Sequence, residues 1–475
     1  TGRFEIEEPP ESFYRKYMGG SAFGLYYILK DMDLSLDPLS PGAIITFMLS
    51  VTTGAPISGQ SRLNINAKSP LSRAIGDSQS GGFFPAELKF AGFDGVVVTG
   101  RSDFPVYLSI INGNVELRDA RHLTGKLTAE VDAVIKMELG EPKAQILQYG
   151  PAAENGVRFA SIMSMANRNN GRTGMGLVMA SKNLKAIVAC GKTRPNLFDS
   201  EQLVSLARMG PELMASNPDM DGLGKYGTAS VVLPQNMFGS LPTRNYTEGQ
   251  FESCEDISGE KLYDTVLKKR DTCYACVVRC KRVVEVCGSE YSVDPIYGGP
   301  EYETLGTFGS YCGVKDLRSI SKANELCNAY GVDTITCGAT IAFAMECFET
   351  GIIGLDQTDG IELHYGNADA MLLVLMQIVK KEGKLGTILA EGSQQAAAIW
   401  GTKAKSCLIT VKGQEAPAHM PQSKKSLALI YAVNPFGADH QSSEHDWMYE
   451  EGTSDLYLSR LALLGLTNPP PAGSF

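Results

Sequence analysis

Residues 62–67 read RLNINA, in which the apolar side chains of Leu63, Ile65 and Ala67 alternate with polar ones. Successive side chains of a strand point to opposite faces, so this alternation predicts a half-buried β-strand. Further short strands, separated by glycines, are predicted at Gly95–Val98, Val106–Ile110, Asn114–Leu117, Ala144–Gln148 and Lys185–Ala189. The first part of the chain, up to residue 194, is therefore expected to be rich in β-structure.

Helical spacing dominates from residue 195 onward, whereas the first part contains one clear amphipathic helix. Thr128 is expected to cap that helix, and its apolar residues recur every fourth position at Leu127, Val131, Ile135 and Leu139. In the second part, Asp316 is expected to cap a helix that Gly331 ends. Other helices are expected over residues 336–350, 368–382 and 389–400. The order of these segments predicts an α+β fold, with a β-rich part followed by mainly helical parts.

Composition excludes several classes of protein. The chain has 475 residues, long enough for two to four domains, and a formal net charge of −10. An acidic balance argues against binding to nucleic acid or to an anionic membrane surface. The longest uncharged stretch, residues 38–61, contains three prolines and is not a membrane span. Because no secretion signal is visible and the eleven cysteines are odd in number, we expect reduced thiols and a cytoplasmic protein.

The sharpest signal is the sequence TCYACVVRC at residues 272–280, which places Cys273, Cys276 and Cys280 at C-x-x-C-x-x-x-C. Three thiolates in a loop after a helix can hold one corner of a zinc or iron–sulfur centre. Zinc is the weaker interpretation because no second cysteine or histidine pair lies nearby. A 4Fe-4S cluster needs a fourth cysteine, either Cys287 or one far away in the sequence. Three incidental buried thiols are the remaining alternative.

Four glycine-rich segments could surround an anionic ligand. They are Gly19–Gly24, Gly54–Gly59, Gly76–Gly82 and Asn169–Gly176. Backbone N–H groups freed by glycine, with Arg62, Arg168 and Arg172 close in sequence, could hold phosphates. Tight turns between strands explain any single segment better, but several such segments in one half of the chain, two of them close to arginines, make the two explanations equal.

Two residues are candidates for proton transfer. Glu303 lies in a glycine-rich stretch (YGGPEYETLGTFG), where we expect a loop to project its carboxylate into a pocket. His440 follows an apolar segment, and a histidine with an ordinary pKa near 6.5 can act as acid or base at neutral pH. Surface carboxylates and a hydrogen-bonded loop histidine are the alternative.

Taken together, the strings GDSQSGGFFPAELKFAGFDGVVVTG, TCYACVVRCK, GGPEYETLG, LCNAYGVDTIT and YAVNPFGADH closely resemble the aldehyde:ferredoxin oxidoreductase family. These are tungsten enzymes with a bis-pyranopterin (molybdopterin) cofactor, and the resemblance covers essentially the whole chain. It implies a β-rich base domain at residues 1–195, a helical domain at 196–406 and the start of a C-terminal helical domain at 407–475. It also implies oxidation of an aldehyde to the carboxylate at tungsten or molybdenum, and a 4Fe-4S cluster that passes electrons to ferredoxin or a ferredoxin-like subunit. Mg2+ between the pterin phosphates and an oligomeric assembly are further implications.

Matching the motifs of this family gives roles to individual residues. Arg62 is expected between a pterin and the cluster, and Gln79, Gly81, Arg168 and Asn169 are expected to contact the pterins or their phosphates. The segment NAYGVD resembles the family's D-x-x-G-L-D pterin motif and gives Asn328 and Asp333, with Asn in place of the usual first Asp. Finally, Cys273, Cys276 and Cys280 match three cluster ligands, and Glu303 and His440 match the residues beside the metal.

One departure concerns the family's late D-x-x-G-L-C motif, which supplies the fourth cluster cysteine. Leu464-Gly465-Leu466 lacks both the Asp and the Cys of this motif, so we expect a shortened sequence. Three other classes stay open. The first is the tungsten subunit of an aromatic acyl-CoA reductase, which uses a cysteine at the metal, and Cys312 is a candidate for that cysteine. The second is a non-catalytic iron–sulfur subunit, and the third is a zinc-stabilised structural protein.

Overall fold

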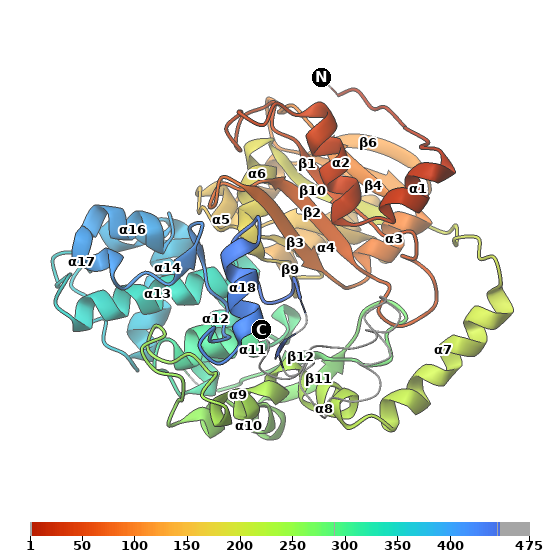
Figure 1. Ribbon diagram of the computed structural model, residues 1–475. Coiled ribbons are helices and arrows are strands. Elements are labelled where there is room, and N and C mark those ends of the chain that lie inside the picture. Colours follow the sequence, from red (N-terminus) through yellow and green to blue (C-terminus); the bar gives the residue numbers. More distant parts are fainter. Residues whose placement is uncertain (1, 289, 444, 447–475) are drawn as a thin grey trace.

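The computed structural model describes residues 2–288, 290–443, 445 and 446. Figure 1 shows the strand-rich N-terminal part, red to yellow, above a helical part that runs from green to blue. The predicted α+β class, β-rich first and helical afterwards, is confirmed. Leu464–Leu466 lie outside the described residues, as does the end of the expected third domain from residue 447 onward.

Two sheets form the N-terminal part. Their strands are β1 (Ile45–Met48), β2 (Leu63–Lys68), β3 (Ile75–Ser80), β4 (Gly95–Val98), β5 (Val106–Ile111), β6 (Asn114–Asp119), β7 (Gln145–Tyr149), β8 (Ile162–Ser164), β9 (Arg168–Asn170) and β10 (Leu184–Cys190). The first sheet is antiparallel in the order β3-β2-β1-β4, and the second has the order β6-β5-β10-β7-β8-β9. Strands β5 and β10 are parallel, and the other neighbours in the second sheet are antiparallel.

The strand predicted at residues 62–67 is β2, but it is buried on both faces rather than one. The helix α2 (Ser21–Asp31) covers its polar face, where Asn64 donates to Ser21 and Asn66 donates to the backbone oxygen of Gly76. A Cβ atom at Gly24 would lie 2.5 Å from the side-chain oxygen of Asn66. The first glycine-rich segment therefore allows a helix to pack closely on a strand.

The helices are α1 (Glu11–Tyr17), α2, α3 (Phe84–Phe90), α4 (Thr128–Leu139), α5 (Pro151–Glu154), α6 (Met175–Ser181), α7 (Ser200–Ala215), α8 (Pro218–Tyr226), α9 (Val232–Met237), α10 (Gly259–Thr265), α11 (Tyr302–Leu305), α12 (Leu317–Tyr330), α13 (Thr334–Glu349), α14 (Ala368–Lys380), α15 (Gly383–Leu389), α16 (Ser393–Trp400), α17 (Thr402–Lys405) and α18 (Lys425–Val433). In the N-terminal part, α4 buries Val131 and Ile135 against one face of the six-stranded sheet. Helix α6 packs against strands of both sheets. The two sheets and α6 thus share one core, whereas α4 packs in a smaller, separate cluster on the six-stranded sheet.

Both ends expected for one helix are confirmed. The Asp316 side chain accepts from the N–H of Arg318 at the start of α12, and Gly331 ends that helix in the left-handed conformation. Two expectations were wrong. Thr128 is the first residue of α4 rather than its cap, and its hydroxyl donates to the backbone oxygen of Asn328. The helix expected over 389–400 is split into α15 and α16, because Gly392 has a φ of 88°.

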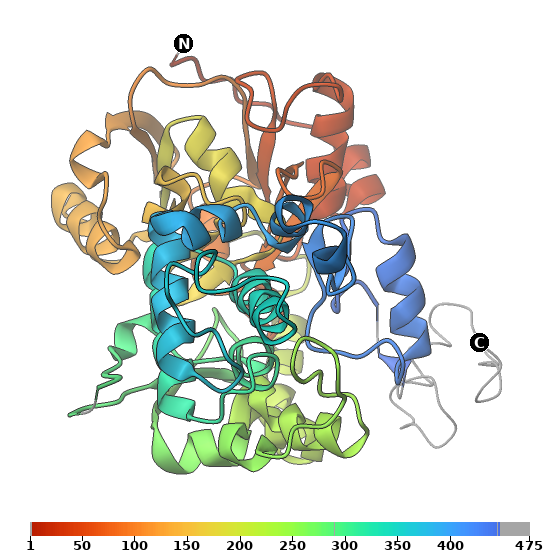
Figure 2. The ribbon, with the colours of Figure 1, turned by 90° about the vertical axis from the view of Figure 1, so that its left-hand side faces the viewer.

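The helical part contacts the N-terminal part at several places. Helix α12 contacts α4, and α14 contacts α5. The Arg158 Nε donates to Glu391 at 2.7 Å, and Lys381 lies 2.6 Å from the other oxygen of the same carboxylate. Figure 2 shows that the blue segment that ends in α18 flanks the green and teal helices. No helix in the described ranges has both the length and the apolar character that crossing a bilayer requires.

Candidate active site

The three cysteines predicted to hold a metal centre lie in a loop between two paired strands. Strands β11 (Leu267–Asp271) and β12 (Lys281–Val284) form an antiparallel hairpin, so a strand, not a helix as expected, leads into the loop. The Thr272 hydroxyl donates to the backbone oxygen of Cys276 at 2.7 Å, and the loop is further turned by a positive φ at Ala275 and Arg279. All three thiols are free and partly exposed.

The spacing of these thiols distinguishes between the two metal centres. Three sulfurs bound to one zinc ion at about 2.3 Å lie about 3.8 Å from one another. Among the described residues, the one group of three such ligands within 4.8 Å of one another is Glu303, His419 and His440, so the three thiols are more widely spread. A 4Fe-4S cluster is larger because each cysteine binds a different iron. The loop therefore fits an iron–sulfur cluster better than zinc.

The pKa of Cys280 shows that this thiol needs a positive metal centre in order to ionise. Burial, then the nearby charges of Glu301, Cys273 and Cys276, raise the pKa of Cys280 to about 11. Without a cation the Cys280 thiol therefore stays protonated at neutral pH, whereas metal binding deprotonates thiols. Cys287 is unsuited to the same centre, since β12 carries the chain away from the loop and Leu267 pairs with Val284 at the opposite end of the hairpin.

The cysteine loop packs against the end of the β2–β3 ladder. A Cβ atom at Gly81 would lie 2.8 Å from the Cys273 sulfur, and the N–H of Tyr274 donates to the Gly82 oxygen at 3.1 Å. Arg62 directly precedes β2 at this end and is exposed, and Gln79 is an exposed residue of β3. The structure thus places Gly81 against the cysteine loop and Arg62 directly before the strand that pairs with β3, and the roles predicted for both residues stay predictions.

Arg168 and Asn169 lie on β9, beside the same loop. Arg168 is buried, forms an ion pair with Asp271 at 3.2 Å and donates to the Thr272 oxygen at 2.7 Å. Asn169 donates to the Val332 oxygen at 3.0 Å, while its own side-chain oxygen is buried with no protein partner. That unpaired acceptor is available to a donor group of a ligand.

The predicted pterin motif lies at the junction of α12 and α13. Asp333 caps α13 and forms an ion pair with Arg172 at 3.2 Å, and the Arg172 Nε is buried without a partner. Asn328 is buried and donates to the Tyr297 oxygen at 2.9 Å. Asp333 therefore lies close to Asn169 across Gly171, where a Cβ atom would be 3.1 Å from the Asp333 carboxylate. Asn328 has a structural partner of its own.

Glu303, His419 and His440 meet in the helical part. Glu303 is on the short helix α11 rather than in the expected loop, and only 9% of its surface is exposed. Its Oε1 lies 3.2 Å from Nε2 of His419 and 3.6 Å from Nε2 of His440, and its Oε2 accepts from the N–H of Ala418 at 2.7 Å. The Nδ1 of His440 is buried with no protein partner. The structure therefore unites the two residues predicted for proton transfer and adds a third.

Four tyrosine hydroxyls hold the segment that carries His419. Each donates to a successive backbone oxygen of residues 416–419: Tyr311 to Ala416, Tyr246 to Pro417, Tyr302 to Ala418 and Tyr431 to His419. Burial raises the pKa of all four tyrosines, so they remain protonated donors. This segment has no regular secondary structure, so the tyrosines fix the position of the Ala418 N–H beside Glu303.

The charges at this centre are set by burial and by the neighbours. Burial alone would raise the pKa of Glu303, but the charge of His440, the hydrogen bond from His419 and the Ala418 N–H lower it to about 2. Burial lowers the pKa of His419 to about 3 against the opposing effect of Glu303. At neutral pH the centre thus holds an ionised carboxylate, which can accept a proton, beside a neutral imidazole, which can donate a hydrogen bond.

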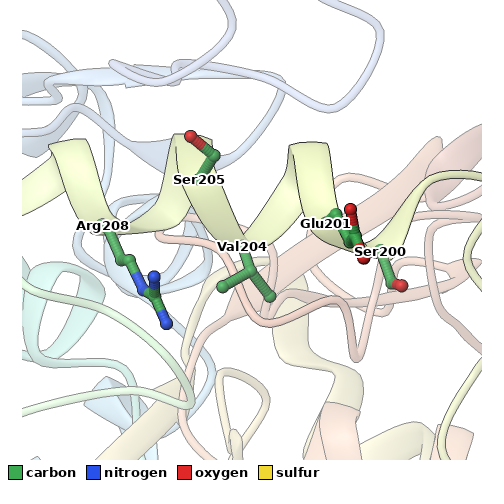
Figure 3. Close-up of a pocket in the computed structure, with 5 residues that line it drawn as sticks. All are labelled: Ser200, Glu201, Val204, Ser205 and Arg208. Atoms are coloured by element: carbon green, nitrogen blue, oxygen red, sulfur yellow. The ribbon is translucent and has the colours of Figure 1, made fainter.

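One surface pocket lies elsewhere. It has a volume of about 330 Å³ and is lined by Ser200, Glu201, Val204, Ser205 and Arg208. Figure 3 shows that all five come from the single helix α7. None of them belongs to the groups described above, so this pocket is not the candidate active site.

His419 and its neighbour Lys424 were missed by sequence reasoning. A signal was present, since three of the five histidines in the chain fall between residues 419 and 445. The candidate Cys312, by contrast, is fully buried and its thiol donates to the Thr307 oxygen at 3.3 Å. Burial also raises the pKa of Cys312, so its environment is that of a structural thiol.

Two family models match the chain. Residues 1–191 match the N-terminal domain of aldehyde ferredoxin oxidoreductase, and residues 206–463 match its domains 2 and 3. The chain is 39% identical over 447 residues to the tungsten-containing aldehyde ferredoxin oxidoreductase of Pyrococcus abyssi, which covers 92% of this chain and 72% of that protein. It is 31% identical over 460 residues to the WOR-like subunit of an aliphatic sulfonate oxidoreductase of Pyrococcus furiosus, with the same coverage of 92% and 72%.

A solved structure is also similar. It is the active-site complex BamBC of benzoyl coenzyme A reductase with 1,5-dienoyl-CoA bound, with a TM-score of 0.75 and 26% identity. The match covers 87% of this chain and 64% of that chain, so this chain spans less than two thirds of its length.

These matches, together with the two-sheet base and the cysteine loop, define a class of oxidoreductase, and the predicted enzyme class is confirmed. The chain belongs to the aldehyde ferredoxin oxidoreductase family, as its motifs indicated. The relatives at 38–40% identity are named as tungsten-containing, so membership implies a tungsten pterin cofactor.

Proposed function

We propose that this chain oxidises an aldehyde to the carboxylate at a tungsten or molybdenum bis-pyranopterin centre. The observation that carries the proposal is the buried, ionised carboxylate of Glu303 between two histidine rings, one of which has a free Nδ1. The names of the relatives at 38–40% identity support the aldehyde as substrate. The structural character of Cys312 favours this function over reduction of an aromatic acyl-CoA.

The residues expected to hold the cofactor are Arg62, Gln79, Gly81, Arg168, Asn169, Asn328 and Asp333. Their environment fits a large anionic ligand in three respects. Arg62 is exposed, Asn169 and Arg172 have buried polar atoms without partners, and glycines allow close approach at Gly81 and Gly171. When bound, the tungsten pterin would supply the two-electron redox chemistry, and Mg2+ would neutralise the pterin phosphates. The chain itself anchors the cofactor and controls protons.

Glu303 and His440 then act on the substrate. Oxidation of an aldehyde by water yields a carboxylate, two electrons and three protons, so the site needs a base. Glu303 takes a proton from the attacking water, and the Nδ1 of His440 hydrogen-bonds to the substrate oxygen. The Ala418 N–H and the Nε2 of His419 hold the two oxygens of Glu303 in place while it does so.

The electrons leave through a cluster held by Cys273, Cys276 and Cys280. The contact between Gly81 and Cys273 supports this route, since it places the cysteine loop against the part of the chain assigned to the pterin. We further propose ferredoxin or a ferredoxin-like subunit as acceptor, an oligomeric assembly and a cytoplasmic location. Both the acidic composition and the free thiols agree with these proposals.

Replacing Glu303 by Gln tests the function. The variant is nearly isosteric, so we expect tungsten and iron content to stay at the level of the unchanged protein while aldehyde oxidation with a viologen dye falls about 100-fold or more. The control is Glu415→Gln, a buried carboxylate that bonds Ser393 and Thr340. Equal loss of metal and activity in Glu303→Gln would show a structural role. Turnover of an aromatic acyl-CoA without aldehyde oxidation would favour the other class.

A further inference from the structure

A buried lysine joins the surroundings of the two candidate catalytic residues. Lys424 directly precedes α18, and 5% of its surface is exposed. Its ammonium nitrogen lies 2.8 Å from Nδ1 of His419 and 3.1 Å from Nδ1 of His445. The two rings are packed edge to face with centroids 4.6 Å apart.

The chemistry of the ammonium group fixes the protonation of both rings. A protonated lysine has three donors and no acceptor, so each Nδ1 that faces it must accept. A neutral imidazole that accepts at Nδ1 carries its proton on Nε2. In His419 this Nε2 lies 3.2 Å from the Glu303 carboxylate, and in His445 it lies 3.0 Å from the backbone oxygen of His440. Both protons are thereby directed at the candidate active site.

We propose that Lys424 is a positioning residue that sets the Nε2–H tautomer of His419 and of His445, and thereby fixes the Glu303 carboxylate and the backbone of His440 for catalysis. This inference rests on the proposed function, since it assigns Glu303 and His440 to the reaction. The inference adds Lys424 as a residue that affects the reaction only through His419 and His445.

The same contacts argue against a metal ion at Glu303, His419 and His440. Their ligand atoms lie within 4.8 Å of one another, as they would around a cation. A histidine that binds a metal usually donates its other ring N–H to an acceptor such as a carboxylate. The other nitrogen of His419 faces an ammonium donor instead, so His419 is arranged as a hydrogen-bond donor to Glu303.

Lys424 loses its charge at a pH close to neutral. Burial lowers its pKa to about 8, and the charges of Glu303 and Asp446 oppose this shift. The other ionisable groups that face it are His419 and His445, whose pKa values are also lowered by burial. A group with a pKa of about 8 loses its proton as the pH rises through that value. Above it, the ammonium no longer dictates the tautomers, and activity should fall.

Two substitutions at Lys424 and one at its neighbour test the proposal in the complete enzyme. Lys424→Met removes the donor, and kcat for the aldehyde should fall about 10- to 100-fold with little change in KM. Lys424→Arg keeps a donor with a pKa above 12, so activity should largely return and its decline at high pH should move upward by about one pH unit or more. Lys425 is exposed, and Lys425→Met should leave both kcat and the decline of activity at high pH unchanged.

The tautomer itself gives a readout that does not depend on activity. Histidine labelled with ¹⁵N distinguishes a protonated Nε2 from a protonated Nδ1, and the chain has five histidines. We expect the Nε2–H form for His419 and His445 at pH 7, and a change in both signals in Lys424→Met. Unchanged signals, or an unchanged pH profile in Lys424→Met and Lys424→Arg, would overturn the proposal. If instead Glu303→Gln keeps full activity, the proposed function fails while the tautomer result stands on its own.

Discussion

Arg168 of strand β9 donates from its guanidinium to the backbone oxygen of Thr272, 2.7 Å away, at the residue directly before the first cluster cysteine. Only 6% of Arg168 is exposed, and it also pairs with Asp271 and bonds the side chain of Asn167. One buried cation thus ties the six-stranded sheet to the cysteine hairpin. The cysteine loop is therefore held in place against β9, the strand that carries two of the residues proposed to contact the pterin.

Replacing Arg168 by Lys should loosen this connection. A lysine keeps the charge but cannot reproduce the planar fork of donors, so at most part of the contacts to Asn167, Asp271 and Thr272 survives. We expect a lower iron content per chain, a broader EPR signal of the reduced cluster and, because Arg168 is also proposed to contact the pterin, a lower tungsten content. Arg73→Lys is the control, because Arg73 is exposed and pairs only with Asp37. Full iron content in Arg168→Lys would contradict the role assigned to this residue.

Gly81→Ala should displace the first cluster ligand. The new methyl group would lie 2.8 Å from the Cys273 sulfur, a distance that real Cβ atoms essentially never show, and 3.4 Å from the Ser61 oxygen. We expect iron content to drop by half or more and dye-linked activity to fall in proportion. Gly222→Ala serves as control, because nothing lies within 4 Å of its Cβ position. A fully loaded cluster in Gly81→Ala would show that the loop adapts.

The strands could be predicted from the sequence because each of them carries a local sequence pattern. The predicted strand Gly95–Val98 is β4 residue for residue, and the helix capped by Asp316 ends at Gly331 as expected. Local patterns do not reveal which face another element covers. The burial of Asn64 and Asn66 depends on α2, whose position is set by the glycines that contact them.

Only part of the candidate site could be predicted from the sequence, because local patterns do not connect residues that are far apart along the chain. Cys273, Cys276 and Cys280 lie within nine residues and give a spacing signal, whereas Ala418 and Glu303 are 115 residues apart in sequence. No periodicity connects such positions. His419 has its place because four tyrosines from three separate segments bond residues 416–419, and only the folded chain shows this arrangement.

Tyr302→Phe tests whether those tyrosines position the catalytic carboxylate. The substitution removes the hydroxyl that donates to the Ala418 oxygen and leaves this buried acceptor without a partner. The loss should reduce the free energy of unfolding by about 1–3 kcal/mol. It should also lower kcat about tenfold, because the Ala418 N–H that orients Glu303 moves. Tyr263→Phe, at an exposed tyrosine, should change neither quantity. Reduced stability with an unchanged kcat would limit the tyrosines to a structural role.

The pH dependence of stability should identify His419 as a buried neutral histidine. Its pKa is lowered to about 3 in the folded protein from 6.5. Between these values the unfolded chain binds a proton that the folded chain does not, so stability decreases as the pH falls below 6.5. From pH 6.5 to pH 5 this amounts to about 2 kcal/mol. Over this range Glu303, whose folded pKa is about 2, stays ionised in the folded state and adds little to the slope.

Denaturant unfolding of the anaerobic protein at several pH values between 5 and 7 measures this slope. His419→Gln removes the titrating group, so its curve should be flatter than that of the unchanged protein over the same range. His364→Gln is the matched control, because 54% of the His364 side chain is exposed and its partner Glu349 is at the surface. Parallel curves for His419→Gln and the unchanged protein would mean that His419 is protonated in the folded state. The donor to Glu303 would then be an imidazolium, and Lys424 would have to be neutral to face it.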